Sequence, residues 1–148
     1  HIGAVAELKK KYEIPFYMSE KDDFIMEDSA KQAVLFGMPK RPTPKIDRNV
    51  EDGDIFEIEG IKIIAISTPG HTPGGMCYLI DGQNILISGD TLFYLSVGRT
   101  DFPYSDHAAL IKGIKEKLLI LPDETVVIPG HGDRTTIGFE KKTNPFLR

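Results

Sequence analysis

The fold is decided around residues 68–75, TPGHTPGG, which follow the apolar run IIAI at residues 63–66. The apolar run predicts a strand, and the prolines and glycines after it predict a tight loop. Prolines restrict the backbone of such a loop, whereas glycines permit conformations that other residues avoid. His71, in the middle of the loop, is therefore expected to lie outside regular structure with an accessible imidazole.

The same design recurs at two other places in the chain. The run ILISG at residues 85–89 leads into Asp90, and the run VVIPG at residues 126–130 leads into His131. Each place has a strand-like run, a glycine and then a residue able to bind a metal ion. If the three runs are strands of one sheet, His71, Asp90 and His131 meet at one edge of that sheet.

The bulk composition indicates one globular domain that acts on a small molecule. The 148 residues are 41% hydrophobic, which is enough for one core and too little for two ordinary domains, so residues 1–148 are expected to form a single domain. The 18 basic and 22 acidic residues are intermixed, with a formal charge of −4. Neither the basic field typical of nucleic-acid binding nor a polybasic membrane patch is present. The expected partner is therefore a small-molecule substrate, and neither nucleic acid nor membrane.

Three further features concern location and processing. The sequence has no apolar run near eighteen residues and no signal-peptide arrangement, so a cytoplasmic location is expected. The single Cys77 lies in an apolar strand pattern and is expected to be a buried structural thiol. The chain starts with His1 and not with methionine, which indicates a processed or incomplete polypeptide.

Periodicity predicts an α/β protein whose strands are mostly antiparallel, because the turns between them are short. Pro122 is expected to end a helix that Ser105 or Asp106 caps. The other expected helices cover residues 2–12, 19–36 and 135–142, and residues 38–49, with three prolines, are expected to be an extended loop. Strands are expected at residues 14–18, 55–58, 61–67, 76–80, 84–88 and 125–128.

The histidines and Asp90 favour a metal site. Three of the four histidines lie in turns, at His1, His71 and His131, whereas His107 is interpreted as an ordinary surface residue at a helix start. Imidazole and carboxylate together suit zinc, iron(II) or manganese, and the thiolate-rich set typical of structural zinc is absent. A single histidine in a glycine turn is more often a hydrogen-bonding loop residue than a ligand. The repeated setting at three strand ends favours the metal interpretation.

Five segments resemble, in order and spacing, the metallo-β-lactamase-fold hydrolases of the glyoxalase II (hydroxyacylglutathione hydrolase) branch. They are GHTPG at residues 70–74, SGDTLF at 88–93, GRTD at 98–101, PGHG at 129–132 and TNPFL at 143–147. The resemblance covers nearly the whole chain. It implies an α/β fold, a four-layer αββα sandwich with the metal ligands on loops at one edge of its two sheets.

The resemblance also implies two divalent metal ions, with zinc expected and iron or manganese as alternatives. His71 resembles the third histidine of the first metal site, Asp90 the carboxylate that bridges both metals, and His131 the terminal ligand of the second site. His1 resembles the last histidine of the family's H-x-H-x-D-H signature, which belongs to the second site. The rest of that signature does not occur here. The resemblance therefore implies that the chain is truncated at its N-terminus and that its metal sites are at most partly occupied.

The implied reaction is the hydrolysis of a small thioester or related acyl compound by a metal-bound hydroxide. Asp90 would act as the bridging carboxylate, and no other catalytic residue is identified. Arg99 and Asp101 are expected to contact and orient the metal ligands without binding the metal themselves, or to form an ion pair that closes a loop. Activity is expected to be impaired in the chain as it stands.

Two alternatives remain open at this point. The segment GRTDF at residues 98–102 also resembles the persulfide dioxygenases, which are mononuclear iron enzymes. The other alternative is an inactive truncated domain that associates with itself through an exposed sheet edge, because unpaired strand edges invite pairing with another chain.

Overall fold

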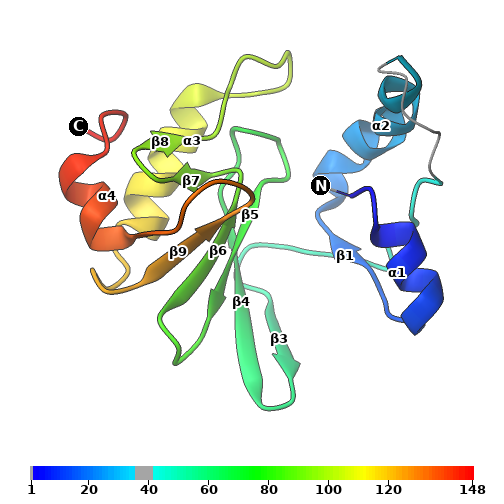
Figure 1. Ribbon diagram of the computed structural model, residues 1–148, viewed down its shortest axis with the longest axis horizontal. Coiled ribbons are helices and arrows are strands. Elements are labelled where there is room, and N and C mark those ends of the chain that lie inside the picture. The colour runs from blue at the N-terminus through cyan, green and yellow to red at the C-terminus, as the bar shows by residue number, and fades with distance from the viewer. Residues whose placement is uncertain (1, 36–41) are drawn as a thin grey trace. The chain divides into compact units, whose positions relative to one another are not determined.

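The computed structural model describes residues 2–35 and 42–148, which divide into two compact units, His1–Val50 and Glu51–Arg148. Figure 1 shows the first unit in blue to cyan and the second in green to red. The single domain expected over residues 1–148 stays a prediction. None of the described helices is long and apolar enough to cross a membrane.

The described residues of the first unit form two α-helices, a short 3-10 helix and a small parallel sheet. Its elements are α1 (Val5–Tyr12), β1 (Tyr17–Met18), the short 3-10 helix η1 (Glu20–Asp22), α2 (Asp23–Leu35) and β2 (Arg48–Asn49). The strand expected at residues 14–18 is reduced to two residues, and Pro15 before it has no N–H for a ladder. Ser19 takes the cap position before η1, but its side chain makes no capping hydrogen bond. The expected helix end at residues 36 and 37 lies outside the described residues.

The second unit is built on a six-stranded mixed sheet with the order β10-β9-β6-β5-β4-β3. All neighbouring strands are antiparallel except β6 and β9, which are parallel. The prediction of mostly antiparallel pairing is therefore correct. The strands are β3 (Ile55–Ile58), β4 (Ile61–Ser67), β5 (Met76–Ile80), β6 (Ile85–Gly89), β9 (Val126–Pro129) and β10 (Thr135–Thr136).

Helices cover one face of this sheet, and the hydrophobic core lies between the sheet and these helices. The connection from β6 to β9 contains α3 (His107–Gly113), which continues directly into a π-helical turn, η2 (Ile114–Leu118). The helix α4 (Ile137–Thr143) ends the chain's regular structure. Alternation along the strands sends every second side chain to this face. The buried cluster includes Cys77, Leu86, Leu110, Ile114, Leu118, Val127 and Ile137, all fully buried.

Burial of these apolar side chains explains why the central strands of the second unit were predictable from the sequence. Each fully buried leucine or isoleucine side chain stabilises the folded state by about 1.5–3 kcal/mol relative to an exposed one. Cys77 belongs to this cluster, as expected from its strand pattern, and burial raises the pKa of its thiol.

A small hairpin outside the six-stranded sheet was not predicted. Its strands are β7 (Leu92–Phe93) and β8 (Ser96–Val97), paired antiparallel with Leu92 opposite Val97. The turn between them contains Leu95, whose φ of 53° is uncommon for a residue other than glycine. Two-residue strands joined by a leucine turn carry neither a clear alternation nor a glycine or proline signal.

Candidate metal centre

The sheet topology brings three loops to one edge. Strands β4 and β6 run in the same direction because each is antiparallel to β5, and β9 is parallel to β6. The carboxyl ends of β4, β6 and β9 therefore lie at the same edge. His71, Asp90 and His131 follow these three strand ends, and all three line one pocket. The convergence predicted from the sequence is confirmed for these residues.

The loop that carries His71 is packed tightly against the start of α3. Gly70 has a φ of 141°, and a Cβ at this position would lie 2.5 Å from the Leu110 Cβ and 2.6 Å from the Asp106 carbonyl oxygen. The backbone N–H of Asp106 donates to the Gly70 carbonyl at 2.8 Å. Glycine is required here for both its conformation and its lack of a side chain.

The structure separates the roles of the two expected cap residues. The Asp106 carboxyl accepts a hydrogen bond from the Ala109 N–H at 3.0 Å and so caps α3. The Ser105 hydroxyl instead donates to the His71 carbonyl oxygen at 2.8 Å. The helix start therefore fixes the backbone on which the imidazole is mounted.

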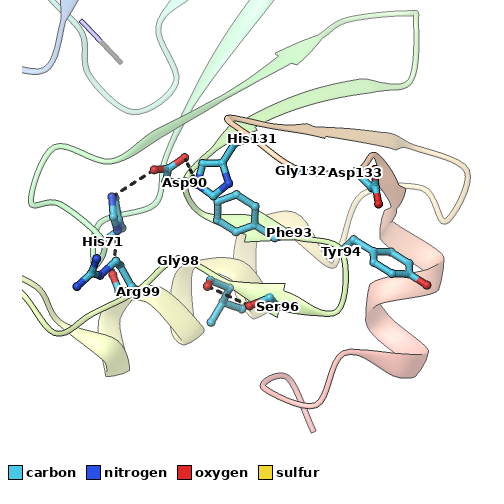
Figure 2. Close-up of a pocket in the computed structure, with 11 residues that line it drawn as sticks. His71, Asp90, Phe93, Tyr94, Ser96, Gly98, Arg99, His131, Gly132 and Asp133 are labelled. Atoms are coloured by element: carbon cyan, nitrogen blue, oxygen red, sulfur yellow. Dashed lines mark hydrogen bonds and ion pairs between the residues drawn. The ribbon is translucent and has the colours of Figure 1, made fainter.

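Asp90 lies between the two histidines (Figure 2). Its Oδ2 is 3.6 Å from the His71 Nε2, and its Oδ1 is 3.7 Å from the His131 Nε2. These separations are too long for strong hydrogen bonds. They are close to the separation of about 3.4 Å expected for two ligand atoms that each lie about 2.1 Å from a tetrahedral metal ion. The donor set and its spacing therefore fit divalent metal ions.

The two histidines lie around one shared carboxylate, that of Asp90. His71 and His131 face opposite oxygens of Asp90. Within the part of the chain that the structure describes, no group of three or more His, Cys, Asp or Glu residues is placed to hold a metal ion. His1, the fourth expected ligand, lies outside the described residues.

The orientation of His71 is fixed by a backbone carbonyl. Its Nδ1 lies 2.9 Å from the Arg99 carbonyl oxygen, which can only accept a hydrogen bond. In the neutral imidazole, Nδ1 must then carry the proton, and the lone pair of Nε2 is directed at the Asp90 side. The Phe102 ring lies edge-on to the imidazole at 5.8 Å.

His131 occupies a more open position. Its side chain is 68% exposed, against 20% for His71 and 14% for Asp90. The Phe93 ring lies 4.7 Å from the imidazole and is tilted by 33°. The pocket is thus deepest at Asp90 and His71 and opens toward His131.

Arg99 and Asp101 form the ion pair expected from the sequence. Two hydrogen bonds join them, at 2.7 and 2.6 Å, and the guanidinium also lies 4.5 Å from the centre of the Phe102 ring. The hydrogen bond from Arg99 lowers the pKa of Asp101 to about 2. Both side chains are largely exposed. The contact of Arg99 with His71 is made by its backbone, so a supporting role for its side chain stays a prediction.

The pocket has a volume of about 440 Å³, and its wall comes largely from residues that sequence reasoning did not single out. Gly98 is the tightest of these, because a Cβ there would lie 2.0 Å from the Asp90 carbonyl oxygen and 3.2 Å from the His71 Cβ. Gly98 is the first residue of the GRTD motif, and its place in that motif was the available signal. The other wall residues are Phe93, Tyr94, Ser96, Val97, Gly132 and Asp133.

Comparison with known proteins places this geometry in context. The family profile described as the Metallo-beta-lactamase superfamily matches residues 1–131. The chain is 40% identical over 149 residues to a Haemophilus influenzae protein named hydroxyacylglutathione hydrolase GloC, and the match covers 99% of the chain and 70% of that protein.

Two solved structures are similar over 99% of the chain. One is described as the BLEG-1 B3 metallo-β-lactamase, with 38% identity and a TM-score of 0.89, and the match covers 71% of that protein. The other is TTHA1623 in a di-iron-bound form, with 40% identity and a TM-score of 0.86, and the match covers 72% of that protein. These similarities confirm the predicted α/β architecture.

Proposed function

The chain belongs to the metallo-β-lactamase superfamily of hydrolases, and we propose that it is a glyoxalase II-like enzyme that transfers the acyl group of a small thioester to water. One observation carries the proposal. The two oxygens of Asp90 each face a histidine Nε2, at 3.6 and 3.7 Å, in a pocket sized for a small molecule.

Proteins of this superfamily bind divalent metals, and a similar structure is described as di-iron-bound. We assign His71 and Asp90 to one ion, and Asp90 and His131 to the other, with zinc as the proposed metal and iron or manganese as alternatives. A bound divalent ion supplies a Lewis acid for the acyl carbonyl and lowers the pKa of a coordinated water.

The chain's own residues have separate tasks in this proposal. The negative charge of Asp90 would reduce the repulsion between two bound cations. The Arg99 carbonyl holds the His71 ring in the tautomer that a ligand needs. Phe93, Tyr94 and Val97 provide apolar surface for the uncharged part of the substrate.

The choice of a thioester is supported by the GloC relative, whose name is that of a thioester hydrolase and which is 40% identical. A second candidate is β-lactam hydrolysis, which the name of the BLEG-1 relative favours. Both reactions transfer an acyl group to water and differ in the leaving group, a thiol or an amine. A persulfide dioxygenase would instead need a single iron ion and oxygen.

The test loads the chain with zinc, iron(II) or manganese and compares three assays. These are hydrolysis of a hydroxyacylglutathione thioester, hydrolysis of a chromogenic cephalosporin, and oxygen uptake with a glutathione persulfide. We expect metal-dependent thioester hydrolysis whose rate falls at least about 100-fold in Asp90→Asn. Mutation of a residue that only hydrogen-bonds a metal ligand already lowers metal affinity or activity about 10–100-fold. His107→Gln is the matched control and should keep the rate. Cephalosporin turnover or oxygen uptake without thioester hydrolysis would overturn the proposal.

A further inference from the structure

A fully buried carboxyl group lies outside the pocket lining, at Glu140 in α4. A buried carboxyl group is costly unless it is well hydrogen-bonded. Its Oε1 accepts from the Thr135 hydroxyl, and its Oε2 accepts from the Asn144 amide at 2.8 Å and from the Leu95 N–H at 3.1 Å. Two of these donors belong to α4 or its immediate surroundings. The third belongs to the β7–β8 turn.

The Leu95 contact is unusual because it holds a strained residue. A φ of 53° is unfavourable for leucine and persists only where the surroundings enforce it. The Asn144 amide nitrogen that donates to Glu140 also donates to the Ser96 carbonyl at 3.0 Å. Glu140 and Asn144 therefore bind the turn at two successive residues, Leu95 and Ser96.

The turn that is held in this way carries much of the pocket wall. Phe93 lies against the His131 ring at 4.7 Å, and Tyr94 and Ser96 also line the pocket (Figure 2). The Tyr94 ring stacks on Phe139 of α4, with centres 5.2 Å apart and planes at 13°. The helix thus contacts the hairpin through one aromatic stack and through the Glu140–Asn144 pair.

We propose that Glu140 is a positioning residue whose buried carboxyl group, with Asn144, fixes the Leu95 turn so that Phe93 and Tyr94 form the substrate-facing wall of the pocket. The substrate part of this inference rests on the proposed function. Glu140 touches neither the pocket nor the proposed metal ligands. Its effect is therefore expected on substrate binding and not on metal binding.

The test uses Glu140→Met, because methionine has a similar length and no oxygen that can accept any of the three hydrogen bonds, whereas glutamine could still accept from Leu95 and Asn144 and donate to the Thr135 hydroxyl. In the metal-loaded chain we expect KM for the thioester to rise about tenfold, with kcat and metal content nearly unchanged. By NMR, hydrogen-exchange protection of the Leu95 N–H and the NOE between Phe93 and His131 should be lost. Thr135→Val is the matched control, since it removes a donor to the same carboxyl group without touching the turn, and it should leave KM and both NMR signals intact.

Further results test the positioning role of Glu140. If Glu140→Met does not fold, Asn144→Ala, which loses the Ser96 contact, should show the same changes to a smaller extent. An unchanged KM and unchanged NMR signals in the folded variant, or an equal rise in KM in Thr135→Val, would overturn the proposal. If the unmodified chain hydrolyses no thioester, the proposed function fails, while the NMR comparison still tests the positioning role.

Discussion

Among single residues, Gly98 shows how closely the backbone is packed behind the metal centre. A Cβ there would lie 2.0 Å from the Asp90 carbonyl oxygen, a backbone atom that cannot rotate away, and 3.2 Å from the His71 Cβ. The N–H of Gly98 donates to the Thr91 carbonyl at 3.0 Å, which ties the two segments together. Any side chain at Gly98 must therefore push apart the two residues proposed as ligands of one ion.

We expect Gly98→Ala to lower both stability and metal affinity. Overpacking of this kind costs about 1–3 kcal/mol or more. Gly113→Ala is the matched control, because its Cβ would approach Thr68 no closer than 3.5 Å and alanine favours helix. Thermal unfolding and zinc titration of the two variants measure the difference. A Gly98→Ala protein as stable as the unmodified chain would show that the backbone contact is dispensable.

At the level of helices and strands, the Asp52 carboxyl group bridges the end of β4 and η2. One carboxyl oxygen of Asp52 accepts from the Ser67 N–H at 2.7 Å, and the other accepts from the Lys117 ammonium at 2.8 Å. The Lys117 hydrogen bond is the main reason that the pKa of Asp52 is lowered from 3.8. A lowered folded-state pKa gives stability that is present above pH 3.8 and is lost as the pH falls through the folded-state value.

Lys117→Met should therefore destabilise the protein at pH 7 by about 0.2–1 kcal/mol, the range of partly exposed ion pairs. The difference from the unmodified chain should shrink as the pH falls below 3.8 and in high salt. Lys115→Met, in the same helical turn and exposed, serves as the control. Denaturant unfolding at several pH values provides the measurement. A difference that persists at the lowest pH would contradict the assignment.

The long strands were predictable and the short hairpin was not, for a physical reason. Strands β4, β5 and β6 combine apolar runs with glycine turns, so local sequence and tertiary packing agree. In the β7–β8 hairpin, Leu95 has a positive φ, and its N–H donates a hydrogen bond to Glu140 of α4, 45 residues later in the chain. Sequence windows do not contain such distant contacts. The π-helical turn of η2 was likewise invisible, since its apolar spacing resembles that of an α-helix.

The candidate site divides in the same way. His71, Asp90 and His131 were predictable because each follows a strand and a glycine, and the strand directions bring them together. The wall made by Phe93 and Tyr94 was not predictable, because it depends on the hairpin.

For the molecule as a whole, one surface is relevant to assembly. Strand β3 is the last strand of the six-stranded sheet within residues 51–148. Its Ile58 is 59% exposed and stands opposite Ile61, which is 41% exposed. An edge strand with exposed isoleucines favours pairing with another chain. The self-association expected from the sequence would then use this edge, and it stays a prediction.

We predict that the chain associates with itself as its concentration rises and that Ile58→Lys weakens this association. A charge on an edge strand opposes pairing and, because Ile58 is exposed, should leave monomer stability nearly unchanged. Ile120→Lys is the control, since Ile120 is 75% exposed and lies outside the sheet. Sedimentation velocity over a range of concentrations gives the answer. Equal association of both variants and the unmodified chain would place the contact elsewhere.

The most direct test of the metal centre is the metal content of the chain, measured by mass spectrometry and calorimetric titration with zinc, iron(II) and manganese. Because Asp90 faces both histidines, Asp90→Asn should weaken binding of both ions, whereas His71→Gln and His131→Gln should each weaken one. His107→Gln should bind as the unmodified chain does. We expect metal binding that is lost in Asp90→Asn, and equal binding by the unmodified chain and Asp90→Asn would contradict the proposed metal centre.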